Sequence, residues 1–389
     1  MDQERIQSAA EFMEDFAERT GLSPAGQFSK RYLWTDAYAV CNFLGLYGET
    51  GDSKWKDLAL LLVDEVHHVL GRHRGDSQHQ GWLSGLPGKE AEAHPTIGGL
   101  RIGKSLDERG PGDPVDEYRE WDRDGQYYHY LTRWMHALNR MTAVTGNHQF
   151  NRWAVELAKT AHRGFVYASS TDSKRMYWKM SINLSYPLVE SMGHHDPLDG
   201  LITYIQLQGT LARDPQGPGR LDLGPEIGDL IGICEGRDWQ TDDLLGLGSL
   251  LCDAHRVAQL FAQGILEGSD MLRIILEASI PGLKYPGREN FLYAPARFRL
   301  AFRELGLAIG LHALERLDSF MRENLTVFKD DRDITILLKT LWKFMSLRDR
   351  IEAYWLDEAN RKTDVWKEHR DINTVMLATS LAPDGFLTV

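Results

Sequence analysis

The chain has 389 residues, of which 42% are hydrophobic and 26% are charged, which is enough for the large core of a folded globular protein. The formal net charge of −12 argues against a nucleic-acid partner and against an anionic membrane surface, because both require clustered Lys and Arg side chains. Cys41, Cys234 and Cys252 share no CxxC spacing, so they indicate neither a disulfide framework nor a zinc site.

The first predicted helix spans Gln3–Thr20 and is acidic and amphipathic. It has neither the basic start nor the apolar stretch of a secretory signal. No apolar run in the chain reaches the ~18 residues that a membrane-spanning helix needs. We therefore expect a cytoplasmic protein that does not bind a membrane.

The next two segments predict a helical hairpin. Leu33–Tyr47 is apolar on nearly every face, whereas Lys54–Leu70 carries its charges on one side. Between them, Gly51 can take the left-handed conformation that ends a helix, and Asp52 can cap the next one. A helix that is apolar all round must be covered on both sides, so we expect an inner helix wrapped by an outer one.

The same contrast recurs along the rest of the chain, and strand signals are almost absent. The last inner helix, Ile372–Leu381, has no outer partner after it, and the N-terminal helix has no inner partner before it, so these two complete a sixth hairpin. The pattern predicts an all-α fold, an (α/α)6 toroid of six helical hairpins in which residues 1–389 form one domain. The other inner helices are expected at Gln126–Val144 and Ser181–Met192 and from near Asp243 and Arg299, and the other outer helices at Arg152–Val166, Leu198–Leu211, Ser269–Ile280 and Ile334–Trp355.

One connection, from about residue 71 to 124, is too long for a turn and is rich in Gly, Pro and charged residues. Long loops inside compact domains are usually functional or disordered. Because this loop leads into an inner helix, we expect it over the mouth of the ring as a lid or wall. The alternative is a surface excursion without a function.

In such a ring the N-terminal ends of the inner helices converge on one face, where their dipoles point positive ends at a central cavity. Most of these ends combine a Trp or Tyr with an acid or amide. Aromatic rings stack on the apolar faces of sugars, while carboxylates and amides bind the hydroxyl groups. We predict four catalytic acids, Asp36, Asp124, Asp243 and Asp371. The predicted substrate-binding residues are Trp34, Trp121, Asp122, Tyr127, Tyr128, Trp178, Lys179, Asn183, Trp239 and His369.

Each acid also has a structural interpretation. Asp36 lies one turn into an apolar helix and can form a salt bridge with Arg31. Asp122 or Asp124 can cap the helix expected near Gln126, and Asp371 is a natural cap as well. The DWQTDDLLG stretch has the same ambiguity: Thr241 or Asp242 can be the cap, with Asp243 as the inward residue.

The stretch RYLWTDAYAVCNFLGLYGETGDSKW and the hairpin pattern resemble the six-hairpin glycosidase-like superfamily, including its N-acylglucosamine 2-epimerase branch. The resemblance covers most of the chain as architecture and implies an (α/α)6 barrel. It also implies a carbohydrate site at the N-terminal ends of the inner helices.

Three functions are compatible with these features. The first is a glycoside hydrolase, inverting and acting on a small oligosaccharide, with Asp36 or Asp124 as one member of the acid/base pair and Asp243 or Asp371 as the other. The second is a sugar epimerase or isomerase with His129 or His369 as the base. His194 and His195 are expected at the C-terminal end of an inner helix, away from the mouth. The third is a non-catalytic binding protein. The predicted partner is a small-molecule carbohydrate, no metal or other cofactor is predicted, and the oligomeric state stays open.

Overall fold

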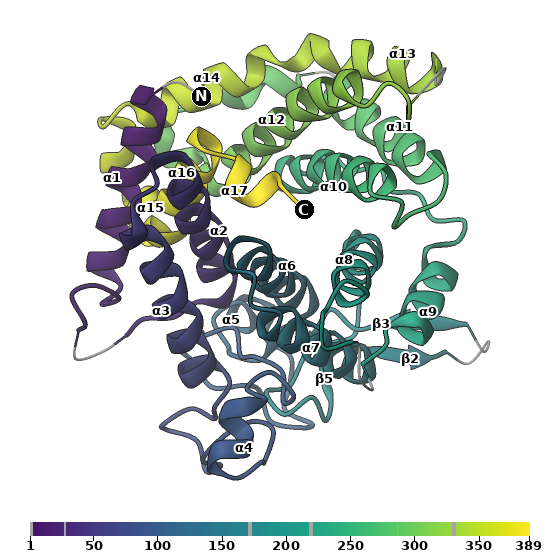
Figure 1. The fold of residues 1–389 in the computed structure, drawn as a ribbon. Coiled ribbons are helices and arrows are strands. Elements are labelled where there is room, and N and C mark those ends of the chain that lie inside the picture. Colours follow the sequence, from purple (N-terminus) through teal and green to yellow (C-terminus); the bar gives the residue numbers. More distant parts are fainter. Residues whose placement is uncertain (1–2, 27–28, 170–172, 218–220, 286, 329–331) are drawn as a thin grey trace. The chain divides into compact units, whose positions relative to one another are not determined.

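The computed structural model describes residues 3–26, 29–169, 173–217, 221–285, 287–328 and 332–389 (Figure 1). Contacts between residues group the chain into two compact units. The N-terminal unit comprises Glu18–Leu44 and Ser53–Gly236, and the C-terminal unit comprises Met1–Ala17, Gly45–Asp52 and Arg237–Val389. Among the described helices, none has the length and apolar character needed to cross a membrane.

The N-terminal unit is mainly helical and includes two small antiparallel sheets. In one sheet, strand β4 (Lys179–Met180) pairs with both β1 (Gln126–Tyr127) and β5 (Pro187–Val189). In the other, β2 (Val166–Ala168) pairs with β3 (Lys174–Met176). The helices are α2 (Leu33–Thr50, whose last residues belong to the C-terminal unit), α3 (Ser53–Leu70), α4 (Gly88–Ala93), α5 (Glu117–Glu120), α6 (Tyr128–Thr145), α7 (Gln149–Phe165), α8 (Asp196–Leu211) and α9 (Gly224–Cys234).

The described residues of the C-terminal unit form helices and connecting turns, without a β-strand. Its α-helices are α1 (Gln3–Arg19, counted to Ala17), α10 (Leu244–Ala262), α11 (Asp270–Lys284), α12 (Ala301–Glu323), α13 (Arg332–Leu341), α14 (Ser346–Leu356), α15 (Asp364–Glu368), α16 (Arg370–Leu381) and α17 (Asp384–Leu387). Short 3-10 turns lie at Arg288–Tyr293, Ala296–Phe298, Trp342–Phe344 and Asn360–Lys362.

Burial separates the helices into the two expected kinds. In α6 every residue from Leu131 to Thr142 is buried, whereas α7 buries one face and exposes its charges on the other. Helices α2, α8, α10, α12 and α16 resemble α6 in being buried on nearly all sides. The predicted contrast between enclosed and amphipathic helices therefore holds in both units.

Two enclosed helices of the C-terminal unit, α10 and α12, pack closely because glycines face each other. A Cβ atom added to Gly310 would lie 2.5 Å from the Cα of Gly248, and one added to Gly248 would lie 2.0 Å from the carbonyl oxygen of Gly306. Larger residues at these positions would push the two backbones apart. The small side chains thus set the helix spacing.

The same unit contains a buried carboxylate, Glu352 on α14, that ties α1 to the last inner helix. Arg5 donates to both of its oxygens at 2.8 and 3.0 Å, and the Nε2 atom of His312 lies 2.7 Å from Oε1. Ser380 on α16 also donates to Oε1. Burial by itself raises the pKa of Glu352, but the hydrogen bonds from His312 and Arg5 outweigh it and hold the pKa at about 2.

The prediction for residues 181–211 was wrong in its element boundaries. Ser181–Met192 is not a helix, because this segment forms the turn after β4 and the strand β5, which pairs with β4. Leu198–Leu211, expected as an outer helix, belongs to α8, which is buried on nearly all sides. His194 and His195 therefore precede an enclosed helix instead of ending one, and His195 is the N-cap residue of α8.

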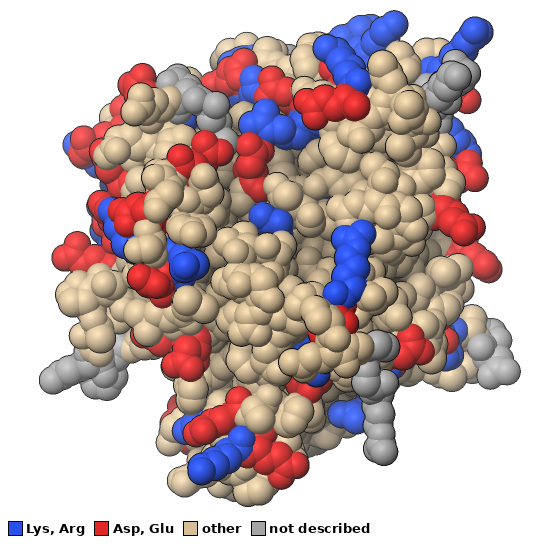
Figure 2. Space-filling view, in the orientation of Figure 1, with Lys and Arg blue, Asp and Glu red and all other residues tan. Residues whose placement is uncertain are grey.

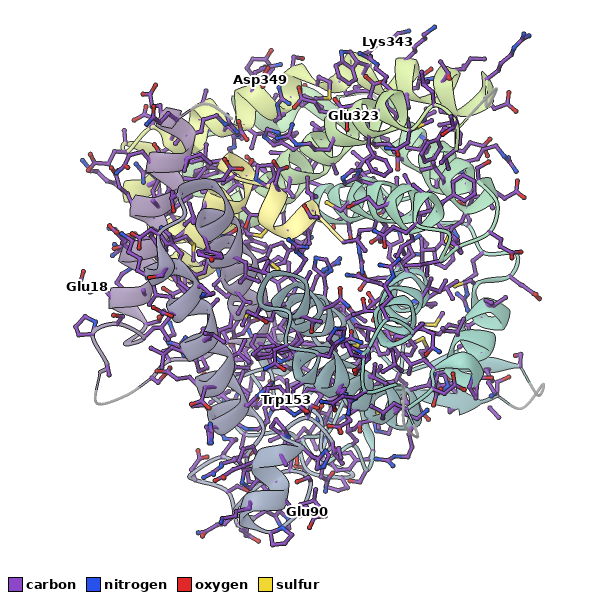
Figure 3. All side chains as sticks on the ribbon, in the orientation of Figure 1. Glu18, Glu90, Trp153, Glu323, Lys343 and Asp349 are labelled. Carbon is purple, nitrogen blue, oxygen red and sulfur yellow. The ribbon has the colours of Figure 1, made fainter. Side chains whose placement is uncertain are left out.

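The connection from residue 71 to 124 has a defined structure anchored on α7. It contains α4 and α5, and Trp153 of α7 donates its indole N–H to the carbonyl of Ala93 at 2.8 Å. Figure 3 labels Trp153 together with Glu90 of α4. The long connection is thus a packed part of the N-terminal unit.

On the face shown in Figure 2, acidic and basic side chains are interspersed.

Candidate functional site

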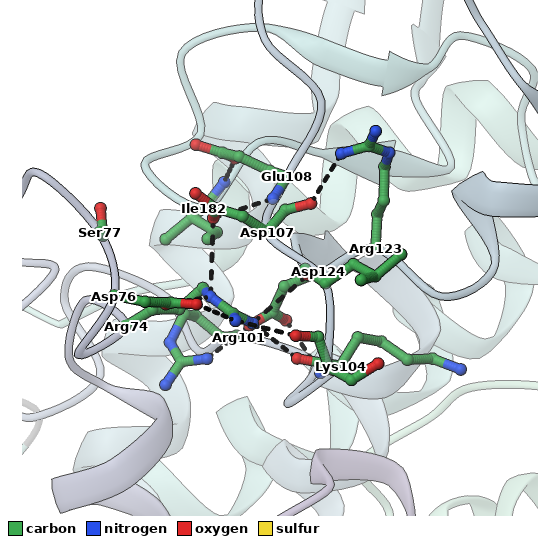
Figure 4. A network of polar contacts seen from close by, with 12 residues as sticks. Arg74, Asp76, Ser77, Arg101, Lys104, Asp107, Glu108, Arg123, Asp124 and Ile182 are labelled. Carbon is green, nitrogen blue, oxygen red and sulfur yellow. Dashed lines mark hydrogen bonds and ion pairs between the residues drawn. The ribbon is translucent and has the colours of Figure 1, made fainter.

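Asp124, one of the predicted catalytic acids, is fully buried in a network of polar contacts (Figure 4). Its Oδ2 atom pairs with Arg101 and lies 3.6 Å from Arg74. Its Oδ1 atom accepts hydrogen bonds from the backbone N–H groups of Gly103, Lys104 and Gly125 at 3.0, 3.3 and 3.1 Å. Both oxygens therefore hold the 71–124 segment in place.

Asp36 on α2 is also buried and occupied. Its Oδ2 atom accepts a hydrogen bond from the backbone N–H of Tyr32 at 2.9 Å, and Oδ1 lies 3.5 Å from Arg31. Arg31 in turn donates to the carbonyl of Thr20 at 2.7 Å. These contacts match the structural interpretation, in which Asp36 pairs with Arg31.

Aromatic rings gather in the N-terminal unit at the starts of α2 and α6 and beside β4. Tyr127 lies at the centre, with ring centroids 5.2 Å from Tyr130 and 5.5 Å from Trp178. Trp121, whose exposed fraction is 53%, meets Trp178 edge-on at 5.5 Å. We call this set the aromatic cluster; its members are Tyr32, Trp34, Tyr38, Trp121, Tyr127, His129, Tyr130 and Trp178.

Strand pairing brings the central members together. Tyr127 is the partner of Lys179 across the β1–β4 pair, and the backbone N–H of Tyr128 donates to the carbonyl of Trp178 at 3.4 Å. Tyr128 itself points into the core, where it packs against Phe165. Of the two adjacent tyrosines, Tyr127 thus belongs to the cluster and Tyr128 to the core.

His129 lies in the first turn of α6, within the aromatic cluster. Its ring centroid is 4.8 Å from that of Tyr130, and its plane is nearly parallel to Trp178 at 6.2 Å. Its Nδ1 atom lies 3.8 Å from Oδ1 of Asp196, the first residue of α8. The side chain of His129 is 30% exposed and that of Asp196 is 9% exposed.

Two buried polar atoms of this pair lack hydrogen bonds within the described part of the chain. Among the described residues, neither His129 Nδ1 nor Asp196 Oδ2 forms a hydrogen bond. An accessible imidazole is the side chain most often used to transfer a proton to and from a ligand. His129 is therefore the best-placed group in this unit for acid/base chemistry.

Lys179 lies beside the cluster but its ammonium group is already occupied. It is fully buried and donates to the carbonyls of Glu120 and Arg123 and to the Glu120 carboxylate, all within 2.9 Å. Asp122 is exposed next to Trp121, and Asn183 accepts hydrogen bonds from Ser185 in the β4–β5 turn. Lys179 and Asn183 thus support the backbone near the site.

The remaining predicted residues lie in the C-terminal unit. Asp243 is the N-cap of α10: it accepts a hydrogen bond from the Gly246 N–H at 2.8 Å and pairs with Arg303 at 2.6 Å. The expectation that Thr241 or Asp242 caps this helix was therefore wrong. Asp371 is half-buried in the first turn of α16, His369 meets the ring of Phe302 at 5.6 Å, and Trp239 is buried.

The other expected caps are also absent from the structure. Helix α6 begins at Tyr128 with Tyr127 as its N-cap and no side-chain cap, so neither Asp122 nor Asp124 caps it. His369 occupies the N-cap position of α16, without a side-chain hydrogen bond, so Asp371 is not the cap there. The backbone of Tyr127 is held by β1 instead.

No protein-family model matches the chain, and no curated protein matches it. Among solved structures, the GH76 α-mannanase from Bacteroides thetaiotaomicron aligns with 99% of this chain and 97% of its own, at 9% identity and a TM-score of 0.55. Cellobiose 2-epimerase from Spirochaeta thermophila DSM 6192 aligns with 97% of this chain and 96% of its own, at 12% identity and a TM-score of 0.50. This chain has the fold of the six-hairpin glycosidase-like superfamily. The predicted (α/α)6 barrel is confirmed.

The pairing of His129 with Asp196 was not predicted from the sequence, because the start of the enclosed helix was placed at residue 181 instead of at residue 196. A local signal was available, because Asp196 is followed by Pro197, and proline is favoured in the first turn of a helix. That signal moves the start of the enclosed helix from residue 181 to residue 196. Asp196 then falls at the same end of its helix as His129 does in α6.

Proposed function

We propose that this chain is a carbohydrate-active enzyme and that the aromatic cluster around His129 is its sugar site. The observation that supports it most strongly is an accessible histidine, backed by the buried Asp196 and flanked by Tyr127, Tyr130 and Trp178. Aromatic faces suit the apolar faces of a sugar ring, and the imidazole suits proton transfer. The two proteins with the same fold named above act on carbohydrates, which agrees with this proposal.

The reaction that suits this arrangement best is an epimerisation or isomerisation. With Nδ1 facing Asp196, the Nε2 atom of His129 is the free base. It removes a proton from the carbon next to the carbonyl group of an open-chain sugar, which leaves an enediolate. Return of the proton to the same face of that carbon gives the starting sugar, and delivery of a proton to its opposite face gives the epimer. Return to the neighbouring carbon, with a proton moved from the second enediolate oxygen to the first, gives the isomer. The carboxylate of Asp196 faces the Nδ1 side of the imidazole ring and orients it for both transfers.

A glycoside hydrolase is the second candidate. It is favoured by Asp243, whose side chain is 38% exposed, in contrast to the buried Asp36 and Asp124. Hydrolysis needs one carboxylic acid to protonate the leaving oxygen and one carboxylate to activate water or to attack the sugar. The two candidates differ in the mass of their products: an epimer or isomer has the mass of the substrate, whereas hydrolysis adds water and splits the substrate in two.

The test is proton NMR of the purified protein with a panel of free sugars and oligosaccharides, in which the anomeric signals are followed over time. We expect signals of a new monosaccharide, or of a disaccharide with a changed reducing end, without cleavage. The variants His129→Gln and Asp196→Asn should lower the rate by at least about a hundredfold and about tenfold, respectively.

The matched control is His68→Gln. His68 also lies beside an aspartate, with its Nδ1 atom 3.3 Å from Oδ1 of Asp64, but both side chains are exposed on the surface of α3. This variant should turn over substrate like the unmodified protein. New reducing ends from cleaved oligosaccharides would move the assignment to the hydrolase, and activity unaffected by His129→Gln would refute the role of His129.

A further inference from the structure

Lys104 occupies an unusual position at the edge of the aromatic cluster. Its backbone is held in the 71–124 segment, because its N–H donates to Oδ1 of Asp124 at 3.3 Å. Its side chain leaves that network and points away from it in Figure 4. The Nζ atom lies 5.3 Å from the ring centroid of Tyr32, close enough for a cation–π interaction.

The ammonium group of Lys104 has no hydrogen bond or ion pair with any described residue. The neighbouring cations differ in this respect, since Arg101 pairs with Asp124 and Lys179 with Glu120. Lys104 is half-buried, and this burial lowers its pKa, while the charges of Asp122 and Asp124 act in the opposite direction. A partly desolvated cation without an ion-pair partner gains from any anion that reaches it.

A chain of ring contacts links this cation to the proposed base. The hydroxyl groups of Tyr32 and Tyr130 are 2.6 Å apart, and the ring of Tyr130 is 4.8 Å from that of His129. The rings of Tyr32 and Tyr130 therefore connect the position of Lys104 with that of His129.

We propose that Lys104 binds an anionic substituent, a carboxylate or a phosphate group, on the sugar that the aromatic cluster holds. The inference rests on the proposed function, because it names the substrate class of the same site. A chain with a net charge of −12 repels anions overall, so an anionic sugar needs a local cation in order to bind. Lys104 supplies that cation at the edge of the aromatic cluster, beside Tyr32.

The test is isothermal titration calorimetry in a phosphate-free buffer, with sugars that differ only in the anionic group. The probes are glucose, glucuronate and glucose 6-phosphate, and the corresponding mannose series. In the unmodified protein at least one anionic member of a series should bind about tenfold or more tightly than its neutral counterpart. Comparison of the carboxylate with the phosphate distinguishes the two sources of charge.

The variant Lys104→Met keeps the length and apolar character of the stem and should abolish this preference, whereas Lys104→Arg should retain part of it. The control is Lys89→Met on α4, because Lys89 is exposed and distant in sequence from the cluster, and this variant should bind like the unmodified protein. Thermal unfolding checks that each variant is folded.

Equal binding of neutral and anionic sugars by the unmodified protein, or absence of saturable binding of every anionic member at millimolar concentration, would overturn the inference without any variant. A preference that survives Lys104→Met would overturn it as well. Binding that depends on Lys104 without turnover of any sugar would contradict only the proposed enzymatic function. Turnover that depends on His129 but ignores the charge of the sugar would contradict only the role of Lys104.

Discussion

Replacement of Asp124 by asparagine tests whether this residue holds the fold or performs chemistry. The carboxylate is fully buried and serves two arginines and three backbone N–H groups. Loss of its charge leaves Arg101, whose side chain is 8% exposed, without its charged partner. Breaking one partner out of a buried ion pair costs about 3–5 kcal/mol, and a neutral amide keeps only part of the backbone hydrogen bonding. We therefore expect Asp124→Asn to lower the free energy of unfolding by about 3 kcal/mol or more.

The assay is urea unfolding followed by tryptophan fluorescence, with activity measured separately under conditions where the variant is folded. Asp76→Asn is the matched control, because Asp76 pairs with Arg74 in the same network but its side chain is 64% exposed. Exposed pairs contribute about 1 kcal/mol or less, so this variant should unfold almost like the unmodified protein. A loss below about 1 kcal/mol for Asp124→Asn, together with lost turnover, would refute the structural assignment and restore Asp124 as a catalytic acid.

Three further predictions concern other parts of the structure. Glu352→Gln should reduce the dependence of stability on pH. The pKa of Glu352 is about 2 in the folded state and about 4.5 in the unfolded chain, so its stabilising contribution is present above pH ~4.5 and is lost as the pH falls towards 2. In acid titrations of unfolding, the difference in stability between the variant and the unmodified protein should therefore shrink over that range. Gly99→Ala should lower the free energy of unfolding in urea by at least about 2 kcal/mol, because Gly99 has a φ of +80° and an added Cβ would lie 2.1 Å from the side chain of Gln126. The control Gly48→Ala, in helix α2, should be neutral or stabilising, because an added Cβ there meets nothing within 4 Å. Trp121→Ala should change the free energy of unfolding by less than about 1 kcal/mol yet weaken sugar binding several-fold in calorimetry; unchanged affinity would remove Trp121 from the sugar site.

Helices with strong apolar patterns could be located from the sequence alone. The expected helices Leu33–Tyr47 and Lys54–Leu70 correspond to α2 and α3, and the glycine between them has a φ of +69°. Burial on all faces and burial on one face leave different periodic patterns, so the distinction between enclosed and outer helices was also predictable. The salt bridge between Arg31 and Asp36 followed from the high cost of an unpaired charge in an apolar helix.

The prediction was weakest where the structure depends on distant partners. Ser181–Met192 has enough apolar residues for a helix, but its strand β5 pairs with β4, and β4 pairs in turn with β1, which lies more than fifty residues earlier. The ion pairs of Asp124 with Arg101 and Arg74 also join residues far apart in sequence, and no local pattern predicts them. At α10, Asp242 and Asp243 are chemically equivalent as caps, so only the backbone distinguishes them.

The central claim is that His129 transfers a proton to and from a sugar, and the incorporation of deuterium tests it most directly. A substrate that emerges from the NMR panel is converted in deuterium oxide, and the product is analysed by NMR and mass spectrometry. A base that exchanges with solvent between the two transfers delivers one deuterium to the carbon next to the carbonyl group. We predict a product one mass unit heavier with the label at that carbon, and loss of both conversion and label in His129→Gln. A product that has gained the elements of water by cleavage of a glycosidic bond, with no deuterium on carbon, would contradict the proposal.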